Sequence, residues 1–150
     1  MFANLYFISG GPSTGKTAVI NLLGKKGYKI LSEAAREIAT EKFSGKSIFE
    51  IDKKIFQDEI FELQKKMIES LKNSNEIVFS DRGFGDTIAY YKINNLKIPD
   101  ENIEYAKKFN YAKVFILEPL NFYKTDGLRQ ESPEEQKRIH KEIIKSYSDL

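Results

Sequence analysis

The sequence predicts an α/β fold in which helices cover both faces of a parallel β-sheet. Short apolar runs alternate along the chain with longer segments that repeat apolar residues at helical spacing, which is the pattern of βαβ units. The first apolar run leads directly into Gly10-Gly11-Pro12, and an amphipathic segment follows this turn. Because connections between parallel strands are right-handed, few topologies fit this order of elements.

Four strands are expected, each a short apolar run that ends near a turn residue or a polar residue. They cover residues 5–9, 28–31, 76–80 and 113–117. Asp81-Arg82-Gly83 follows the third run directly, and Glu118-Pro119 closes the fourth.

Six helices are expected, at residues 16–25, 33–42, 49–72, 87–93, 99–109 and 133–146. Ser32 is placed to cap the second helix and Asp86 the fourth, since both residue types favour the N-cap position. Apolar residues share one face of the first helix, namely Ala18, Val19, Leu22 and Leu23. A longer apolar stripe follows the third helix, through Phe56, Ile60, Leu63, Met67 and Leu71.

Composition excludes several classes of protein. The 150 residues contain no cysteine and one histidine, which excludes disulfides, zinc–thiolate sites and multi-histidine metal sites. No apolar run reaches the ~18 residues of a membrane span, and a net charge of +2 offers no concentrated basic face for nucleic acid. We therefore expect a single domain, residues 1–150, in a cytoplasmic protein without nucleic acid or membrane partners. The oligomeric state stays open.

The most specific motif is the phosphate-binding pattern G-x-x-x-x-G-K-[ST], which residues 10–17 match in full. Glycines let backbone N–H groups converge on phosphate oxygens, and the following helix directs its positive dipole end at the same anion. The lysine reaches the β- and γ-phosphates, and the threonine hydroxyl is placed to bind Mg²⁺. The nucleotide-binding residues predicted here are Gly10, Gly11, Pro12, Ser13, Thr14, Gly15, Lys16, Thr17 and Ala18.

Two further groups of polar residues follow predicted strands, where ligands bind in open α/β sheets. Asp81 is expected to hold Mg²⁺ together with Thr17, and Arg82 a substrate group or the transferring phosphate. Glu33 is a candidate to accept the proton of an attacking hydroxyl. The alternatives are an exposed Asp–Arg pair at a strand end, and a first-turn acid that pairs with Arg36.

Other residues favour a structural interpretation. The N-cap role of Asp86 is preferred to direct chemistry, Tyr90 and Tyr91 are expected to pack, and His140 is expected to be solvated. The polar segment 121–131 is either a solvated loop or a basic lid that brings Arg129 to the transferring group.

Taken in order, several motifs together resemble a known family. They are residues 7–17, Glu33-Ala34-Ala35-Arg36-Glu37-Ile38, Asp81-Arg82-Gly83 with Asp86-Thr87 and Ala89-Tyr90-Tyr91, residues 114–118, and Tyr123, Asp126 and Arg129. The chain resembles the P-loop NTPase family called "AAA domain", which includes NadR-type kinases and a GTP-binding protein. It is more distantly similar to thymidylate and deoxynucleoside kinases.

The resemblance implies a three-layer α/β/α P-loop fold with a parallel sheet of kinase-type order 2-3-1-4. It implies the nucleotide over residues 10–17, Asp81 near Mg²⁺, Glu33 and Arg82 near the acceptor, and Arg129 in a lid. Members of the family usually continue past a tyrosine like Tyr147 into a fifth strand, and this sequence stops at Leu150. No apolar strand ends in Asp-Glu, so a ring-forming remodelling ATPase is not predicted.

Three functions stay open. The first is a kinase that transfers the γ-phosphoryl of Mg-ATP to a nucleoside-like or nucleotide-like acceptor, with Lys16, Asp81, Glu33, Arg82 and Arg129 as its catalytic residues. The second is an acceptor-independent ATPase or GTPase switch. Against it, the base-reading pattern N-K-x-D is absent and Phe84 replaces the switch glycine, although GTP stays possible. The third is a catalytically weak nucleotide-binding module that acts on a protein partner. The acceptor depends on how the segment around Gln57 faces the crevice.

Overall fold

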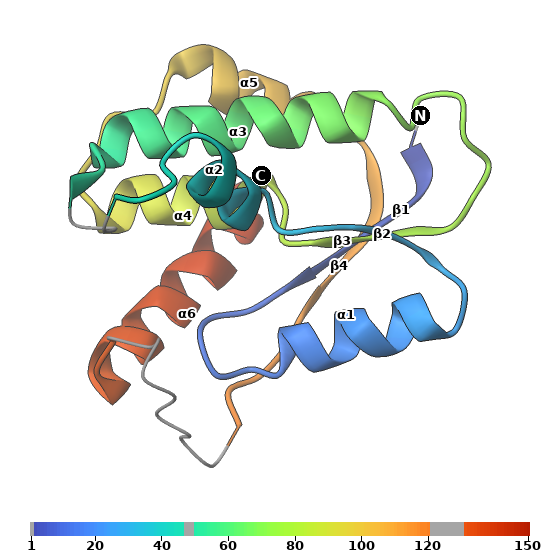
Figure 1. The fold of residues 1–150 in the computed structure, drawn as a ribbon, viewed down its shortest axis with the longest axis horizontal. Coiled ribbons are helices and arrows are strands. Elements are labelled where there is room, and N and C mark those ends of the chain that lie inside the picture. Colours follow the sequence, from blue (N-terminus) through green and yellow to red (C-terminus); the bar gives the residue numbers. More distant parts are fainter. Residues whose placement is uncertain (1, 47–49, 121–130) are drawn as a thin grey trace.

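The computed structural model describes residues 2–46, 50–120 and 131–150 (Figure 1). Within these residues, four parallel strands form one sheet of order β2-β3-β1-β4. The strands are β1 (Phe2–Ser9), β2 (Lys29–Leu31), β3 (Val78–Asp81) and β4 (Tyr111–Ile116). This order confirms the predicted fold class.

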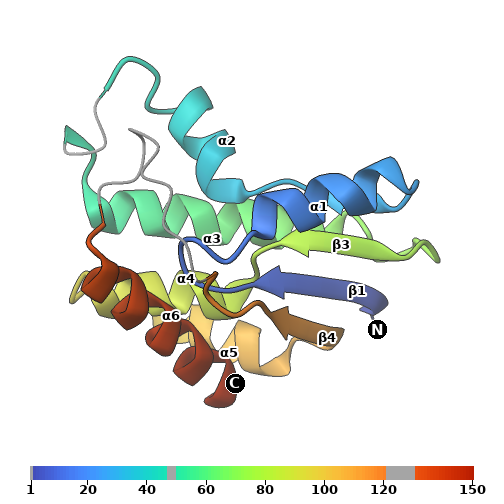
Figure 2. The same ribbon diagram turned by 90° about the horizontal axis from the view of Figure 1, so that it is seen from below.

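Six helices occur in the described residues and complete the three layers. They are α1 (Lys16–Lys25), α2 (Ala34–Glu41), α3 (Lys53–Glu69), α4 (Phe84–Ile93), α5 (Asp100–Lys108) and α6 (Pro133–Ser148). Helices α1 and α3 lie on opposite sides of the sheet, and α4 and α6 lie side by side (Figures 1 and 2).

The main core lies on the face of the sheet opposite α1. Side chains alternate along β1, so Leu5 and Phe7 point into this core. The Phe7 ring, which is fully buried, contacts the rings of Phe84, Phe109 and Tyr111. Helices α3, α4, α5 and α6 supply most of the other buried residues of the cluster, and Val78 of β3 adds to it.

Helix α1 does not bury the apolar face that its sequence suggests. Ile20 and Lys16 are its buried residues, whereas Leu22 is 55% exposed. Successive helical residues are turned by ~100°, so a residue two positions from Ile20 lies on the opposite side of the helix. The side that faces the sheet is therefore set by Lys16 and Ile20.

Helix α3 has two buried faces rather than one. Ile60 packs with Ala34 and Ile38 of α2, as the apolar stripe predicts. Phe61 and Ile68 belong to the main core, and they lie on a second face that the stripe misses. Helix α3 is therefore packed between α2 and the main core. This packing fixes the position of the polar residues that α3 carries near the sheet edge.

Two predicted helix caps are wrong. The N-cap of α2 is Glu33, and the hydroxyl of Ser32 instead donates to Glu37. Helix α4 begins at Phe84, two residues before Asp86, so Asp86 lies within the first turn and is 1% exposed. None of the helices in the described ranges is long and apolar enough to span a membrane.

Candidate functional site

The glycine-rich loop between β1 and α1 is held in a conformation that needs its glycines. Gly10 and Gly15 have positive φ angles of 135° and 80°, and a Cβ on Gly10 would lie 2.7 Å from the carbonyl oxygen of Leu117. Ser13 also has a positive φ, 62°, a strained conformation that often marks functional loops. The loop thus has the close-packed backbone that a phosphate cradle requires.

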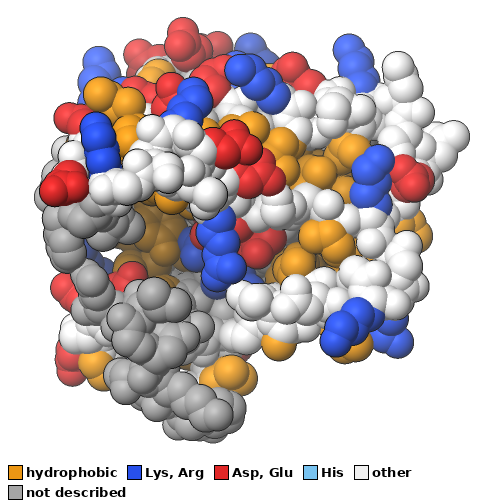
Figure 3. Space-filling model, viewed as in Figure 1, with side chains coloured by type: hydrophobic (Ala, Val, Ile, Leu, Met, Phe, Trp, Pro, Cys, Tyr) orange, Lys and Arg blue, Asp and Glu red, His pale blue; other side chains and the backbone are white. Residues whose placement is uncertain are grey.

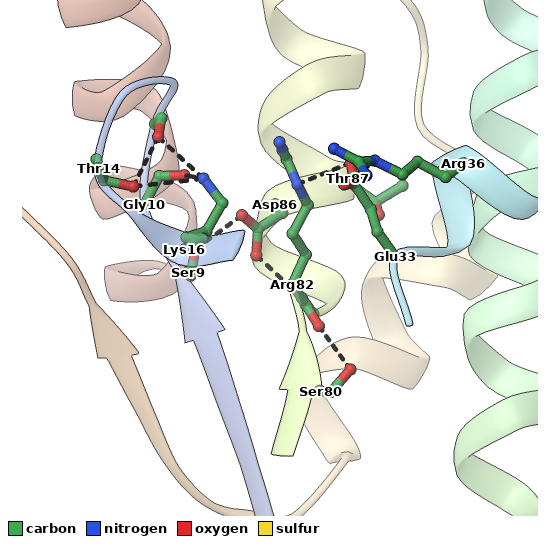
Figure 4. A network of polar contacts seen from close by, with 12 residues as sticks. Ser9, Gly10, Thr14, Lys16, Glu33, Arg36, Ser80, Arg82, Asp86 and Thr87 are labelled. Atoms are coloured by element: carbon green, nitrogen blue, oxygen red, sulfur yellow. Dashed lines mark hydrogen bonds and ion pairs between the residues drawn. The ribbon is translucent and has the colours of Figure 1, made fainter. Parts of the chain in front are cut away.

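Lys16 folds back onto this loop. Its Nζ donates to the carbonyl oxygens of Gly10 at 2.6 Å and Gly11 at 2.9 Å (Figure 4). Burial and the nearby positive charge of Arg82 lower the pKa of Lys16 to about 8, although Asp86, Asp81 and Glu33 oppose this shift. The ammonium is therefore poorly solvated, and an incoming anion would find it already desolvated.

Arg82 is held against Glu33 at the carboxyl edge of the sheet. Its Nε lies 3.1 Å from Glu33 Oε1, and Arg36 Nε lies 3.5 Å from Glu33 Oε2 (Figure 4). The guanidinium also lies over the ring of Tyr90, 5.3 Å from its centre. The Glu33–Arg36 pair is the one that the structural alternative for Glu33 predicts from their spacing, whereas the sequence did not predict that Glu33 also contacts Arg82.

The backbone at Arg82 explains the Asp-Arg-Gly motif. Arg82 has a φ of 72° and donates its N–H to the carbonyl of Ile8 in β1 at 2.9 Å. A Cβ on Gly83 would lie 2.6 Å from the Phe7 ring. The strained arginine and the close-packed glycine together turn the chain from β3 into α4. Burial alone would lower the pKa of Arg82, but its interactions with Tyr90, Glu33 and Asp86 outweigh burial and raise the pKa.

Asp81 has an oxygen suited to a cation. Among the described residues, Oδ1 of Asp81 is buried and has no hydrogen-bond partner. Burial and then the charge of Glu33 raise its pKa, against the effects of Arg82 and Lys16. Thr17, in the first turn of α1, is exposed. The described residues contain no cluster of three or more acidic or histidine ligands; Mg²⁺ in nucleotide sites usually takes one or two protein carboxylates and leaves its other positions to water and phosphate.

A pocket of about 550 Å³ opens beside these charges. Glu33, Arg82 and Asp86 line it on one side, and α3 and α4 supply apolar and amide side chains, among them Phe56, Ile60, Tyr90, Gln57 and Gln64. Figure 3 shows a hollow with hydrophobic side chains inside it on this side of the molecule. Gln57 therefore faces this pocket, a point that the sequence left open. Tyr90 lines the pocket and also packs against the main core.

Several pocket residues were missed by sequence reasoning. Gln64 is buried and its Oε1 accepts from the Thr87 hydroxyl at 2.8 Å. Arg138 and Glu135 reach the pocket from α6. A glutamine one heptad after Gln57 was the available signal for Gln64, because residues seven apart share a helix face. Nothing in the sequence indicated that α6 would line this pocket.

Asp86 joins three elements from position N3 of α4, rather than serving as the N-cap of that helix. Its Oδ1 accepts from the Ser9 hydroxyl at 2.7 Å, and its Oδ2 accepts from the Gly83 N–H at 3.0 Å and the Tyr147 hydroxyl at 2.6 Å. These bonds connect the end of β1, the Asp-Arg-Gly turn and α6. The N-cap prediction failed because α4 starts earlier, so the carboxylate turns inward.

His140 is also buried, contrary to the sequence expectation of a solvated residue. It is 6% exposed, and its Nδ1 accepts a hydrogen bond from the Gly11 N–H at 3.0 Å. The middle of helix α6, whose sequence is rich in charged residues, packs against the phosphate loop. The helical pattern of the sequence alone does not predict this contact. Arg129 and most of the predicted lid lie outside the described residues.

Comparison with known proteins finds one family and several similar structures. A sequence model of the family described as "AAA domain" matches residues 5–150, and no curated protein matches the chain. The chain is similar to NadR protein solved in complex with NR, at 24% identity and a TM-score of 0.72 over 99% of this chain and 43% of that one. A second NadR structure, in complex with NAD and AMP-PNP, matches at 21% identity and a TM-score of 0.69, over 99% and 42%.

Deoxyadenosine kinase from M. mycoides, with products dCMP and a flexible dCDP bound, matches at 17% identity and a TM-score of 0.60, over 97% of this chain and 84% of that one. The chain thus spans less than half the length of the NadR chains. These likenesses establish the kinase-like P-loop fold, and the matching sequence model shows the family. With this kinase-like P-loop fold, the chain belongs to the family described as "AAA domain".

Proposed function

We propose that the chain is a single nucleotide-binding domain with phosphotransferase activity. It binds Mg-ATP at residues 10–18 and transfers the γ-phosphoryl group to a nucleoside-like or nucleotide-like acceptor in the pocket of about 550 Å³. The observation that supports this most is the position of the Glu33–Arg82 ion pair, which lines the pocket while Arg82 is bonded through its backbone to β1 beside the phosphate loop.

The residues divide into two groups by the part of the reaction that they serve. Lys16 contributes a charge to the phosphates, exchanging its present bonds to Gly10 and Gly11 for bonds to phosphate oxygens. Arg82 stabilises charge on the transferring group, because its ion pair and the Tyr90 ring orient the guanidinium. Catalysis of this kind depends on positioning and charge rather than on a covalent intermediate.

The acceptor hydroxyl is placed against Glu33. Its oxygen attacks the γ-phosphorus, the bond from phosphorus to the β-phosphate oxygen breaks, and ADP leaves. The hydroxyl proton passes to the Glu33 carboxylate, which two arginines face in the free protein. With a phosphate as acceptor no proton has to be removed, and Glu33 then only orients Arg82.

Mg²⁺ would be held by Thr17 and Asp81, and it would neutralise charge that develops on the β- and γ-phosphates. The unpartnered Oδ1 of Asp81 fits that role, because a buried carboxylate oxygen without a donor is costly unless a cation approaches it. Arg129, which lies outside the described residues, is retained in the proposal as a lid residue.

The pocket lining supports a flat, partly apolar acceptor. Phe56 and Tyr90 offer aromatic surface, while Gln57 and Asn94 offer amide groups that hydrogen-bond the edge of a heterocycle. The NadR and deoxyadenosine kinase structures were solved with NR, NAD or deoxynucleotides, which agrees with an acceptor of this class.

The test is release of ADP from Mg-ATP and of GDP from Mg-GTP, with and without pools of nucleosides, nicotinamide riboside and nucleoside monophosphates. Release that rises sharply with one pool member, and that Lys16→Ala abolishes, would establish the kinase and its acceptor class. Turnover that ignores every acceptor would favour the NTPase switch. Tight binding without turnover would favour the weak nucleotide-binding module.

A further inference from the structure

One peptide group of the phosphate loop is held from both sides. The carbonyl of Gly10 and the N–H of Gly11 belong to the same peptide unit. Lys16 Nζ donates to that carbonyl at 2.6 Å, and the Gly11 N–H donates to His140 Nδ1 at 3.0 Å. Hydrogen bonds in such a chain polarise one another, so the lysine strengthens the bond to the histidine.

Helix α6 approaches this peptide as closely as its backbone permits. A Cβ on Gly11 would lie 2.7 Å from Cβ and 3.0 Å from Cα of His140. Both His140 and Gly11 are buried. The imidazole is therefore fixed in place, and the loop peptide has little freedom to rotate while the bond exists.

The hydrogen bond from the Gly11 N–H to His140 becomes more important when a nucleotide binds. On the proposed function, Lys16 leaves the Gly10 carbonyl for the phosphates, and His140 is then the remaining side-chain partner of the Gly10–Gly11 peptide among the contacts described here. We propose that His140 is a positioning residue for the phosphate loop, whose neutral imidazole holds that peptide in its binding orientation. This proposal rests on nucleotide binding by residues 10–18, and it does not depend on which acceptor is phosphorylated.

The hydrogen bond specifies one tautomer. Nδ1 accepts, so the neutral ring carries its proton on Nε2, which faces Glu118 Oε2 at 3.7 Å. A second proton would sit on Nδ1 and point at the Gly11 N–H, so a ring protonated on both nitrogens cannot accept this hydrogen bond. The other charged groups on the elements packed around α6 are Lys16 beyond the Gly10–Gly11 peptide, Asp86 at Tyr147, and Lys92 at Glu142 and Asp149.

Two variants separate the hydrogen bond from the mere presence of a side chain. His140→Asn places an amide oxygen where Nδ1 stands and keeps an acceptor that does not titrate. His140→Gln is similar in bulk but puts its amide at the position of Nε2. Binding of ATP would be measured by calorimetry from pH 5.5 to 8.5 for both variants and wild type, and thermal melting would be recorded beside it.

We expect His140→Asn to bind ATP within ~3-fold of wild type at pH 8, and His140→Gln to bind about 10-fold more weakly, the loss expected for one buried hydrogen bond. Wild type and His140→Asn should both bind ATP less tightly towards pH 5.5, because the terminal phosphate takes up a proton there. Wild type should lose more affinity than His140→Asn, whose amide does not titrate. Equal binding by the two variants at matched melting temperatures would overturn the proposal.

Imidazole nitrogen shifts give a reading that needs no variant. The chain has one histidine, so its signals are unambiguous. A neutral ring protonated on Nε2 supports the proposal, and a ring protonated on Nδ1 refutes it. Binding without phosphoryl transfer would refute the kinase but leave the role of His140 intact. Equal phosphoryl transfer by the Asn and Gln variants would refute the role of His140 and leave the kinase intact. Failure of wild type to bind ATP would refute both the kinase and the role of His140.

Discussion

The Tyr147 hydroxyl donates to Oδ2 of Asp86 at 2.6 Å and so ties the last turn of α6 to the first turn of α4. The ring lies so close to Gly85 that a Cβ there would stand 2.7 Å from it. Burial and the charge of Asp86 raise the pKa of Tyr147 well above its usual value, so the hydroxyl stays a donor at any ordinary pH. Asp86 in turn binds the Ser9 hydroxyl at the end of β1.

Tyr147→Phe should destabilise the protein, because the Asp86 carboxylate loses one of its three donors while buried. Loss of a hydrogen bond to a buried charged group costs about 1.5–3 kcal/mol. Urea unfolding would measure it. Tyr111→Phe is a matched control, since it removes a half-buried hydroxyl for which no such bond is described. An equal loss in both variants would contradict the role given to Tyr147.

Nucleotide affinity should weaken as the pH rises above about 8, the value to which burial lowers the pKa of Lys16. Phosphate binds the charged amine, so each pH unit above the pKa removes up to ~10-fold of affinity until the loop's other donors dominate. Calorimetry with ATP in EDTA between pH 7 and 10 tests this. Lys16→Arg should bind without that slope, and an unchanged slope would place the titration elsewhere.

Lys16 should affect the stability of the folded protein in the opposite direction from nucleotide affinity, because its contribution to stability rises with pH. Its pKa is lower in the folded chain than the ordinary 10.5, so the unfolded chain binds more protons between about pH 8 and 10.5. The free energy of unfolding should therefore gain a contribution from Lys16 as pH rises through that window. Lys16→Met removes this contribution. Denaturant unfolding at pH 7 and pH 9.5 in both proteins would measure the difference, and identical pH dependence would argue against it.

Asp81→Asn should lower Mg²⁺-dependent turnover far more than Mg²⁺-free nucleotide binding, because it replaces the unpartnered carboxylate oxygen proposed for the cation. A loss of about 100-fold in kcat would match an effect of roughly 3 kcal/mol on the transition state. Asp58→Asn, in α3, is an acidic control at a residue outside the phosphate loop and outside the lining of the pocket. Equal loss of turnover and of Mg²⁺-free binding would indicate a structural role instead.

Glu33→Gln should reduce kcat for a hydroxyl acceptor by about 100-fold, within the range of general base catalysis. Acceptor-independent nucleotide hydrolysis should change little. Arg36→Gln is the matched control, because Arg36 contacts the same carboxylate and is mostly exposed. Steady-state kinetics would compare the two, and a Glu33→Gln enzyme with wild-type kcat would remove the proposed base.

The order of the elements could be predicted from sequence because apolar runs and glycine-rich turns are local signals. Strand β1, helix α1 and the loop between them were located from residues 5–25 alone. The sheet order 2-3-1-4 came from the resemblance, since local patterns carry no information on which strands pair. Its agreement with the observed sheet confirms that inference.

The site was predicted less completely, because burial depends on partners distant in the chain. His140 lies in a helix with a charged pattern, and its neighbour Gly11 is 129 positions away. Asp86 resembles an N-cap in sequence, and only the earlier start of α4 turns it inward. The residues that long-range packing brings to the pocket, such as Arg138, have no local signature.

The central position of β1 has a consequence for how the chain is made. Strand β1 pairs Leu5 with Val78 and Ser9 with Ile116, so both of its neighbours leave the ribosome long after it does. At 5–20 residues per second the first of these partners emerges about 4–15 s later. During that interval an apolar strand has both edges unpaired, which is the condition that invites aggregation. We expect nascent chains that stop before β3 to depend more on chaperones than nascent chains that extend past β4.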